Sequence, residues 1–206
     1  MSSMSAPIYV LRHGETVWNT QHRQQGHRNS PLTARGQEQA RRMGMALGAC
    51  LGEEGADLVS STQGRAVQTA GIVIGQLGER CLTWTRDARL REIGIGDWEG
   101  HTREELLAAG QQAGASRDES DWFLDAPGAE PLEAFAGRIR SFLDGVRLER
   151  PLVVVCHGQT SMVLRGIYLG MTPEESLRLD QPQDAFYRLA DGKATHIPAQ
   201  VIEPAF

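Results

Sequence analysis

Two histidine–glycine pairs lie far apart in this sequence, and each follows a short apolar run. His13-Gly14 comes after the run that begins at Ile8, and His157-Gly158 comes after the run at residues 152–156. An imidazole can act as a nucleophile or exchange a proton near neutral pH. Arg12 places a guanidinium directly before the first histidine. These residue types predict a site that handles a negatively charged group.

A second arginine strengthens this prediction. Arg65 falls in the first turn of a predicted helix, where free backbone N–H groups and helix polarity favour an anion. Two histidines and two arginines repel one another when charged, and a phosphate dianion between them removes that repulsion because a guanidinium donates two parallel hydrogen bonds to its oxygens. The N–H groups of Gly158 and Gln159, at a helix start, are further candidate donors. One imidazole is therefore expected to attack phosphorus and form a phosphohistidine, without a metal ion.

Such chemistry also needs a proton donor. A leaving alkoxide must gain a proton, and the water that attacks next must lose one, so a carboxylic acid is expected nearby. Glu92 is the candidate, in a turn with three glycines among residues 90–100. Glu15 and Glu99 are weaker alternatives, because nothing else in the sequence places them at the site.

The elements that must position these residues alternate between strands and helices, which predicts one α/β domain over residues 1–206. Since ligands bind at the carboxyl ends of strands in open α/β sheets, both histidines are expected at that edge. Strands are predicted at residues 8–11, 57–61, 81–84 and 151–156, and a terminal hairpin at 185–189 and 194–201 around Asp191-Gly192. Helices are predicted at residues 33–49, 64–77, 101–109, 132–148 and 161–169.

Residues 18–27, within the polar stretch 15–30, and residues 110–126 are the expected rim of the pocket. The first segment is a long polar loop of the kind that is usually functional or mobile, and its candidate lining residues are Trp18, Asn19, Arg23, Gln25, Gly26 and His27. These two segments also show the fewest sequence patterns from which structure or function can be predicted. Sugar phosphates, phosphoglycerates, nucleotides and cofactor precursors all remain open as substrates.

Composition excludes several classes of protein. With 206 residues, 40% hydrophobic and 23% charged, the chain has the composition of a globular domain. Its net charge is −5, so the chain has no overall positive potential that would attract nucleic acid. No apolar run approaches the roughly 20 residues that a membrane helix needs. Three cysteines without a C-x-x-C pair indicate thiols in a reducing compartment, so a cytoplasmic enzyme is expected. The oligomeric state is left open.

Metal and cysteine chemistry are not expected. His22, His27 and His101 show no H-E-x-x-H or paired-cysteine spacing, so neither a metal nor another cofactor is predicted. Cys156 would need an arginine six residues later to act as a phosphatase nucleophile, and Met162 stands there. Cys156 is therefore expected to be a buried strand residue.

Five motifs occur in order along nearly the whole chain, from Ile8 to about Gly192. They are Leu11-Arg12-His13-Gly14-Glu15-Thr16 with Asn19; Ser60-Ser61 with Arg65-Ala66 and Gln68-Thr69-Ala70; Glu92 with Gly96-Asp97-Trp98-Glu99-Gly100 and Thr102; Pro127-Gly128 with Glu130; and Val155-Cys156-His157-Gly158. Together these motifs resemble the histidine phosphatase superfamily, in its phosphoglycerate-mutase-like branch. The resemblance implies a three-layer α/β/α sandwich around a mixed, mainly parallel sheet.

The resemblance also implies roles for individual residues. It implies that His13 is phosphorylated and that Glu92 donates and accepts the proton. Arg12, Arg65 and His157 then hold the phosphoryl group, with further substrate contacts from Asn19, Gln25, Gly26 and Gln159.

The chain departs from the mutases of this family at one point. Mutases carry a paired-arginine motif after the glycine-rich turn, whereas residues 110–126 hold only Arg117, followed by Asp118, Glu119 and Asp121. A phosphomonoesterase acting on a small phosphorylated metabolite, with inorganic phosphate as the product, is therefore expected. Phosphoglycerate mutase-type transfer and a catalytically idle phosphate-binding or regulatory module of the same fold are the alternatives.

Overall fold

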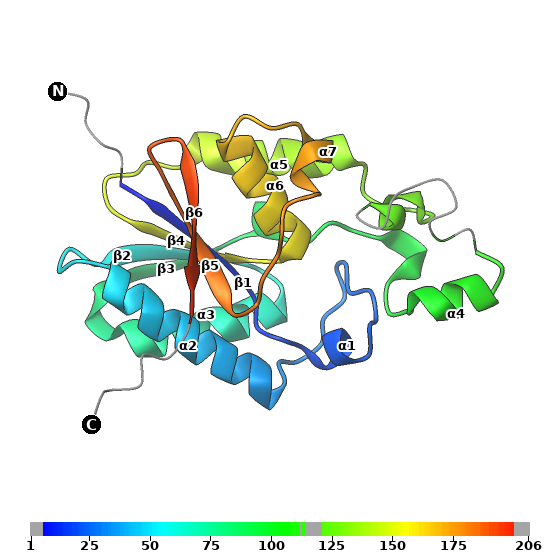
Figure 1. Cartoon of the computed structure of the whole chain (residues 1–206), viewed down its shortest axis with the longest axis horizontal. Helices are drawn as coiled ribbons and strands as arrows, with labels where there is room; N and C mark the ends of the chain where they lie inside the picture. The colour runs from blue at the N-terminus through cyan, green and yellow to red at the C-terminus, as the bar shows by residue number, and fades with distance from the viewer. Residues whose placement is uncertain (1–5, 112, 114–120, 200–206) are drawn as a thin grey trace.

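A central sheet lies between two layers of helices in the computed structural model, which describes residues 6–111, 113 and 121–199 (Figure 1). Within these residues, six strands follow the order β3-β2-β4-β1-β5-β6. The first four are parallel, while β5 is antiparallel to β1 and β6 to β5. The strands are β1 (Ile8–Arg12), β2 (Ala56–Ser61), β3 (Cys81–Asp87), β4 (Leu152–Cys156), β5 (Ala185–Ala190) and β6 (Lys193–Pro198). The predicted mixed, mainly parallel α/β/α sandwich is confirmed.

The helices divide between the two faces of the sheet. Helices α2 and α3 cover one face, and α5, α6 and α7 lie over the other, while α1 and α4 lie to one side (Figure 1). Their bounds are α1 (Val17–Thr20), α2 (Ala34–Cys50), α3 (Gly64–Leu77), α4 (Arg103–Ala108), α5 (Leu132–Gly145), α6 (Gly158–Tyr168) and α7 (Pro173–Ser176). Short 3-10 turns are η1 (Gly78–Arg80), η2 (Ala88–Leu90), η3 (Gly96–Trp98) and η4 (Trp122–Asp125). Within the described ranges, no helix is long and apolar enough to span a bilayer.

Strand β1 shows why two helical layers form. Its side chains alternate between the faces of the sheet, so Tyr9 and Leu11 belong to the core under α2 and α3. Ile8 and Val10 belong to the core under α5 and α6. A strand that is apolar on both faces needs a helix layer on each side.

The helix predictions hold in their positions and differ at some ends. Helix α3 spans the predicted residues 64–77, and Thr33 caps α2 by accepting a hydrogen bond from the Gly36 N–H at 3.0 Å. Helix α6 begins at Gly158 rather than at 161, because strand β4 leads into it through the extended residue His157. Helix α5 ends at Gly145 rather than at 148.

Two four-residue helices, α1 and α7, were not predicted. Each is too short for a hydrophobic period and is held by a capping box, Thr16 with Asn19 in α1 and Thr172 with Glu175 in α7.

Some strands differ from the prediction at their ends. Strands β1 and β3 run to Arg12 and Asp87, beyond their predicted ends. In the terminal hairpin, β6 ends at Pro198, and the predicted end at 201 lies outside the described residues.

Strand register brings the two histidine–glycine pairs together. Strands β1 and β4 are parallel neighbours, with Arg12 opposite Cys156 at their carboxyl ends. The residues that follow, His13 and His157, therefore leave the sheet side by side. Strand β2 flanks β4 on its other side and ends at Ser61.

Candidate active site

The two imidazoles lie against each other at the edge of the sheet. The ring centroids of His13 and His157 are 5.2 Å apart, with 61° between the ring planes. The backbone N–H of His13 donates to the Cys156 carbonyl at 3.0 Å, which continues the pairing of β1 with β4. Both histidines are buried. The sheet topology thus joins residues that are far apart in the sequence.

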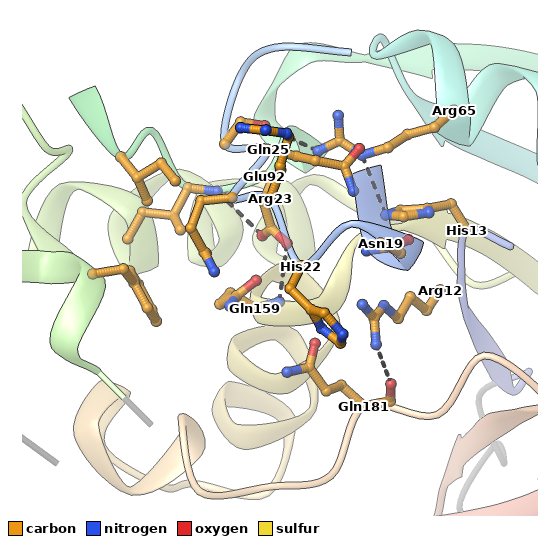
Figure 2. Close-up of a pocket in the computed structure, with 15 residues that line it drawn as sticks. Arg12, His13, Asn19, His22, Arg23, Gln25, Arg65, Glu92, Gln159 and Gln181 are labelled. Carbon is orange, nitrogen blue, oxygen red and sulfur yellow. Dashed lines mark hydrogen bonds between the residues drawn. The ribbon is translucent and has the colours of Figure 1, made fainter. Parts of the chain in front are cut away.

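The hydrogen bonds of His13 fix which ring nitrogen carries the proton. Its Nδ1 lies 2.8 Å from the Gly14 carbonyl oxygen, which can only accept, so Nδ1 is the protonated nitrogen. Nε2 therefore carries the lone pair, and the Arg65 Nε–H donates to it at 3.2 Å (Figure 2). Burial, together with the charges of Arg65 and Arg12, holds the pKa of His13 well below its ordinary value. His13 is therefore a neutral imidazole, and it lines the cavity.

Arg65 is buried in the first turn of α3 and binds two carbonyl oxygens of the preceding loop. Its Nη1 donates to Arg28 O at 2.7 Å, and its Nη2 donates to Gly26 O at 2.9 Å. Burial lowers the pKa of Arg65 to about 10. Gly26 has a φ of +49°, and a Cβ there would lie 2.3 Å from the Glu99 carboxylate, so the loop requires glycine at this position.

Three polar atoms of the predicted site are buried without a hydrogen-bond partner among the described residues. They are the Arg12 Nε, the His157 Nδ1 and the Gln25 Oε1. Their neighbouring nitrogens are engaged: the Arg12 Nη1 donates to Gln181 O at 2.5 Å, and the His157 Nε2 is 2.8 Å from Ser61 Oγ. Burial and the charge of Arg65 keep the pKa of His157 well below its usual range. Because buried polar groups in proteins are normally paired, this cluster indicates the place of a polar ligand.

Glu92 reaches the same site from the glycine-rich turn, and its carboxylate meets the N-terminus of α6. Oε1 accepts from the Thr160 N–H and hydroxyl, both at 3.1 Å, and from the Ile93 N–H at 3.1 Å. Oε2 accepts from the Gln159 N–H at 3.2 Å (Figure 2). This last bond differs from the sequence-based expectation: the Gln159 N–H, expected to face a phosphate, is occupied by Glu92.

The two alternative carboxylates lie outside the cavity. Glu15 accepts from the Thr33 hydroxyl at 2.8 Å. Glu99 accepts from the N–H groups of His27 and Arg28, at 2.7 and 3.2 Å, and so holds the loop that precedes Arg65. Glu92 is therefore the carboxylate that the structure brings to the candidate nucleophile.

A cavity of about 270 Å³ connects these groups (Figure 2). Of the ten predicted site residues, His157 and Gly158 do not line it; His157 packs against His13, and Gly158 begins α6. Trp18 and His27, two candidates for the rim, do not line it either. The lining residues are Arg12, His13, Asn19, His22, Arg23, Gln24, Gln25, Gly26, Arg65, Glu92, Ile93, Ile95, Phe123, Gln159 and Gln181.

Gln181 is the lining residue that sequence reasoning missed most clearly. It lies just before β5, and no local motif marks it. The pairing of β5 with β1 brings it to the site, where its carbonyl binds Arg12. Its neighbour Gln183 donates from Nε2 to His13 O and to Asn19 Oδ1, both at 3.2 Å.

Within the described residues, no three or more His, Cys, Asp or Glu side chains cluster as metal ligands would. Cys156 is a buried strand residue, as predicted, and burial raises the pKa of its thiol far above the usual range.

Comparison with known proteins agrees with this arrangement. A family model described as "Histidine phosphatase superfamily (branch 1)" matches residues 8–194. The "Probable phosphoglycerate mutase GpmB" of Salmonella paratyphi C is 34% identical over 183 residues, which cover 84% of this chain and 80% of that protein. The protein of the same name from Yersinia enterocolitica is 31% identical over 176 residues, covering 84% and 79%.

Two solved structures have the same fold. The alpha-ribazole phosphatase from Shigella flexneri superposes with a TM-score of 0.73 at 26% identity, covering 94% of this chain and 96% of that one. The mycobacterial glucosyl-3-phosphoglycerate phosphatase, solved with VO3, has a TM-score of 0.73 at 27% identity, covering 89% and 90%.

Proposed function

The chain belongs to branch 1 of the histidine phosphatase superfamily, and from that premise we propose that it is a phosphomonoesterase that works through a phosphohistidine at His13. The substrate is a small phosphorylated metabolite, and the products are its alcohol and inorganic phosphate. The observation that carries the proposal is the state of His13: its Nδ1–H is held by Gly14 O, so that a neutral imidazole presents the Nε2 lone pair to the cavity.

In the first step, the Nε2 lone pair attacks phosphorus and the P–O bond to the alcohol breaks. Glu92 gives its proton to the leaving oxygen; Oε2, which accepts a single protein hydrogen bond, has room to carry that proton. Arg65 stops donating to Nε2 and donates to a phosphoryl oxygen instead. The unpartnered Arg12 Nε supplies a further polar contact to this group, and His157, which packs against His13 without lining the cavity, is proposed to contact it through its unpartnered Nδ1.

In the second step, the Glu92 carboxylate takes a proton from water as the water attacks phosphorus. The P–N bond breaks, its electron pair returns to Nε2, and phosphate leaves. Asn19, Gln25, Gly26 and Gln159 lie around the same cavity and are proposed as additional contacts to phosphate or substrate. His13 and Glu92 are thereby restored for the next turnover.

Phosphoglycerate mutase activity is the second candidate, because the GpmB proteins that the chain resembles carry that name. In a mutase, the phosphohistidine returns its phosphoryl group to a second hydroxyl instead of to water. Incubation with 3-phosphoglycerate separates the two: we expect release of inorganic phosphate, and conversion to 2-phosphoglycerate without release would favour the mutase.

The proposed function is tested by trapping the intermediate. We expect that p-nitrophenyl phosphate, quenched in base during turnover, labels the peptide that contains His13 with a phosphate that is lost in acid. His13→Ala should lose the label and at least about 10⁴-fold in kcat. His196→Ala, at an exposed histidine of β6, is the matched control and should retain both. Undiminished turnover by His13→Ala would exclude this mechanism.

A further inference from the structure

An ion pair lies beside the turn that carries Glu92, and neither of its members lines the cavity. Arg138 on α5 donates from Nε to Glu130 Oε1 at 2.8 Å and from Nη2 to Glu130 Oε2 at 2.9 Å. The two side chains are only 17% and 20% exposed. Glu130 is also tied to the turn, because its Oε2 accepts from the Gly94 N–H at 3.2 Å and its own N–H donates to Gly94 O at 2.8 Å.

The same guanidinium binds three backbone carbonyls, that of Glu92 and two that precede it. The Arg138 Nη1 donates to Arg89 O at 2.5 Å and to Arg91 O at 2.7 Å. Its Nη2 donates to Glu92 O at 3.0 Å. Arg91 and Glu92 lie between the turns η2 and η3, outside any helix or strand, so their carbonyls lack the partners that regular structure would provide, while Arg89 is the middle residue of η2. Arg138 takes the place of those partners.

The backbone and the carboxylate of Glu92 are thus held by two adjacent helices. Arg138 on α5 binds the Glu92 carbonyl, while Gln159 and Thr160 on α6 bind the carboxylate. Thr160 lies between the two sets, because its hydroxyl can donate its one proton either to Glu92 Oε1, at 3.1 Å, or to Arg91 O, at 3.0 Å. A general acid must be within hydrogen-bond reach of the proton it moves, and a 1 Å displacement of such a group can cost about 100-fold in rate.

We propose that Arg138, paired with Glu130, is the positioning residue that keeps the Glu92 carboxylate aligned with the phosphoryl group on His13. The inference rests on the proposed function, since it assigns to Arg138 control of the proton transfer made by Glu92. Lysine cannot replace it fully, because one ammonium group cannot reach a carboxylate and three carbonyls in a fixed plane.

Two substrates that differ in leaving group test this inference. The p-nitrophenolate ion leaves without much help from an acid, whereas the alkoxide of an alkyl phosphate such as glycerol phosphate needs a proton. We expect Arg138→Met to lower kcat/KM for glycerol phosphate by about 10- to 100-fold and to lower it much less for p-nitrophenyl phosphate. With p-nitrophenyl phosphate, phosphohistidine should accumulate, because water activation by Glu92 is slowed. Vanadate should bind within about threefold of the normal affinity.

Three further variants make the test specific. Arg138→Lys should show the same leaving-group selectivity in weaker form, and it decides the matter if Arg138→Met does not fold. Glu130→Gln, which keeps the contacts of Arg138 with the backbone carbonyls, should lose less kcat/KM for glycerol phosphate than Arg138→Met does. Arg140→Met, at an exposed arginine on the same helix, should match the unchanged protein.

The outcomes separate this inference from the proposed function. If Arg138→Met loses kcat/KM equally for both substrates and also binds vanadate more weakly, the role of Arg138 is merely structural and the inference is overturned. A folded Arg138→Lys protein whose ratio of kcat/KM between the two substrates is unchanged would overturn it as well. In either case, a His13→Ala variant that remains inactive and unlabelled leaves the proposed function standing. An active His13→Ala removes the proposed function itself.

Discussion

At the scale of single residues, hydrogen bonds make the two nitrogens of His13, and the two carboxylate oxygens of Glu92, chemically unequal. His13 has one ring nitrogen bound to a carbonyl and the other directed at the cavity. Glu92 has three hydrogen bonds on Oε1 and one on Oε2, so its two oxygens are not equivalent. These unequal environments suit the two roles that we propose, attack for His13 and proton exchange for Glu92.

Glu92→Gln tests that division directly. Glutamine keeps the size of the side chain and one acceptor oxygen but cannot exchange a proton, so we expect kcat for an alkyl phosphate to fall by about 10²- to 10⁴-fold. Vanadate binding should be retained. Steady-state kinetics and vanadate inhibition measure both effects, with Glu133→Gln, an exposed position on α5, as the control. An unchanged kcat would remove Glu92 from the mechanism.

At the scale of elements, the glycine after His13 is needed for packing. A Cβ on Gly14 would lie 2.2 Å from the carbonyl oxygen of Gly36 on α2, and a Cβ on Gly36 would lie 2.0 Å from the Glu15 carbonyl oxygen. In both cases the added Cβ would clash with a backbone oxygen, so the clash could not be relieved by rotating a side chain. The N-terminus of α2 is therefore pressed directly against the loop that follows β1 and carries His13.

Gly36→Ala should separate these two segments. We expect a loss of about 1–3 kcal/mol in the free energy of unfolding, with reduced turnover because the loop of His13 shifts. Gly71→Ala is the matched control: it lies within α3, exposed, and apart from the backbone of its own helix no described atom comes within 4 Å of its added Cβ. That variant should gain about 0.5–1 kcal/mol. Urea unfolding measures the free energy of unfolding of each variant, and p-nitrophenyl phosphate assays measure its turnover. A Gly36→Ala protein of normal stability would contradict the packing argument.

At the scale of the whole molecule, two buried neutral imidazoles make folding sensitive to acid. In the folded protein the pKa values of His13 and His157 lie well below 6.5, mainly because both are buried. In the unfolded chain each histidine binds a proton below about pH 6.5, so acid favours unfolding. Their contribution to stability is complete above that pH and is lost as the pH falls below it.

Without bound phosphate, we therefore expect the free energy of unfolding to fall between pH 7 and pH 5. Each histidine adds a slope of at most about 1.4 kcal/mol per pH unit, so the pair adds at most about 2.7. Urea unfolding at several pH values measures this slope. The double variant His13→Gln/His157→Gln, in which neither position titrates, should show a smaller slope; an identical slope would mean that the two histidines do not carry the effect.

Local patterns in the sequence were sufficient to predict those features that depend on a short stretch of chain. Apolar runs that end in His-Gly predicted both central strands, the 3.6-residue period predicted α3 to its ends, and alternating elements predicted the α/β sandwich. The sequence also singled out Glu92, Arg12 and Arg65, because cations and a carboxylate beside strand ends suit phosphate chemistry. These conclusions depend on short stretches of chain whose pattern reflects which face is buried.

Contacts between segments that are distant in the sequence could not be predicted and are seen in the folded chain. The placement of β4 beside β1 joins His157 to His13, the return of β5 brings Gln181 to Arg12, and the packing of α5 brings Arg138 to the Glu92 turn. The occupation of the Gln159 N–H by Glu92 is likewise a tertiary contact. Such contacts join residues that share no periodicity or motif, because strand order and helix packing are set by burying the whole core and not by any local stretch of sequence.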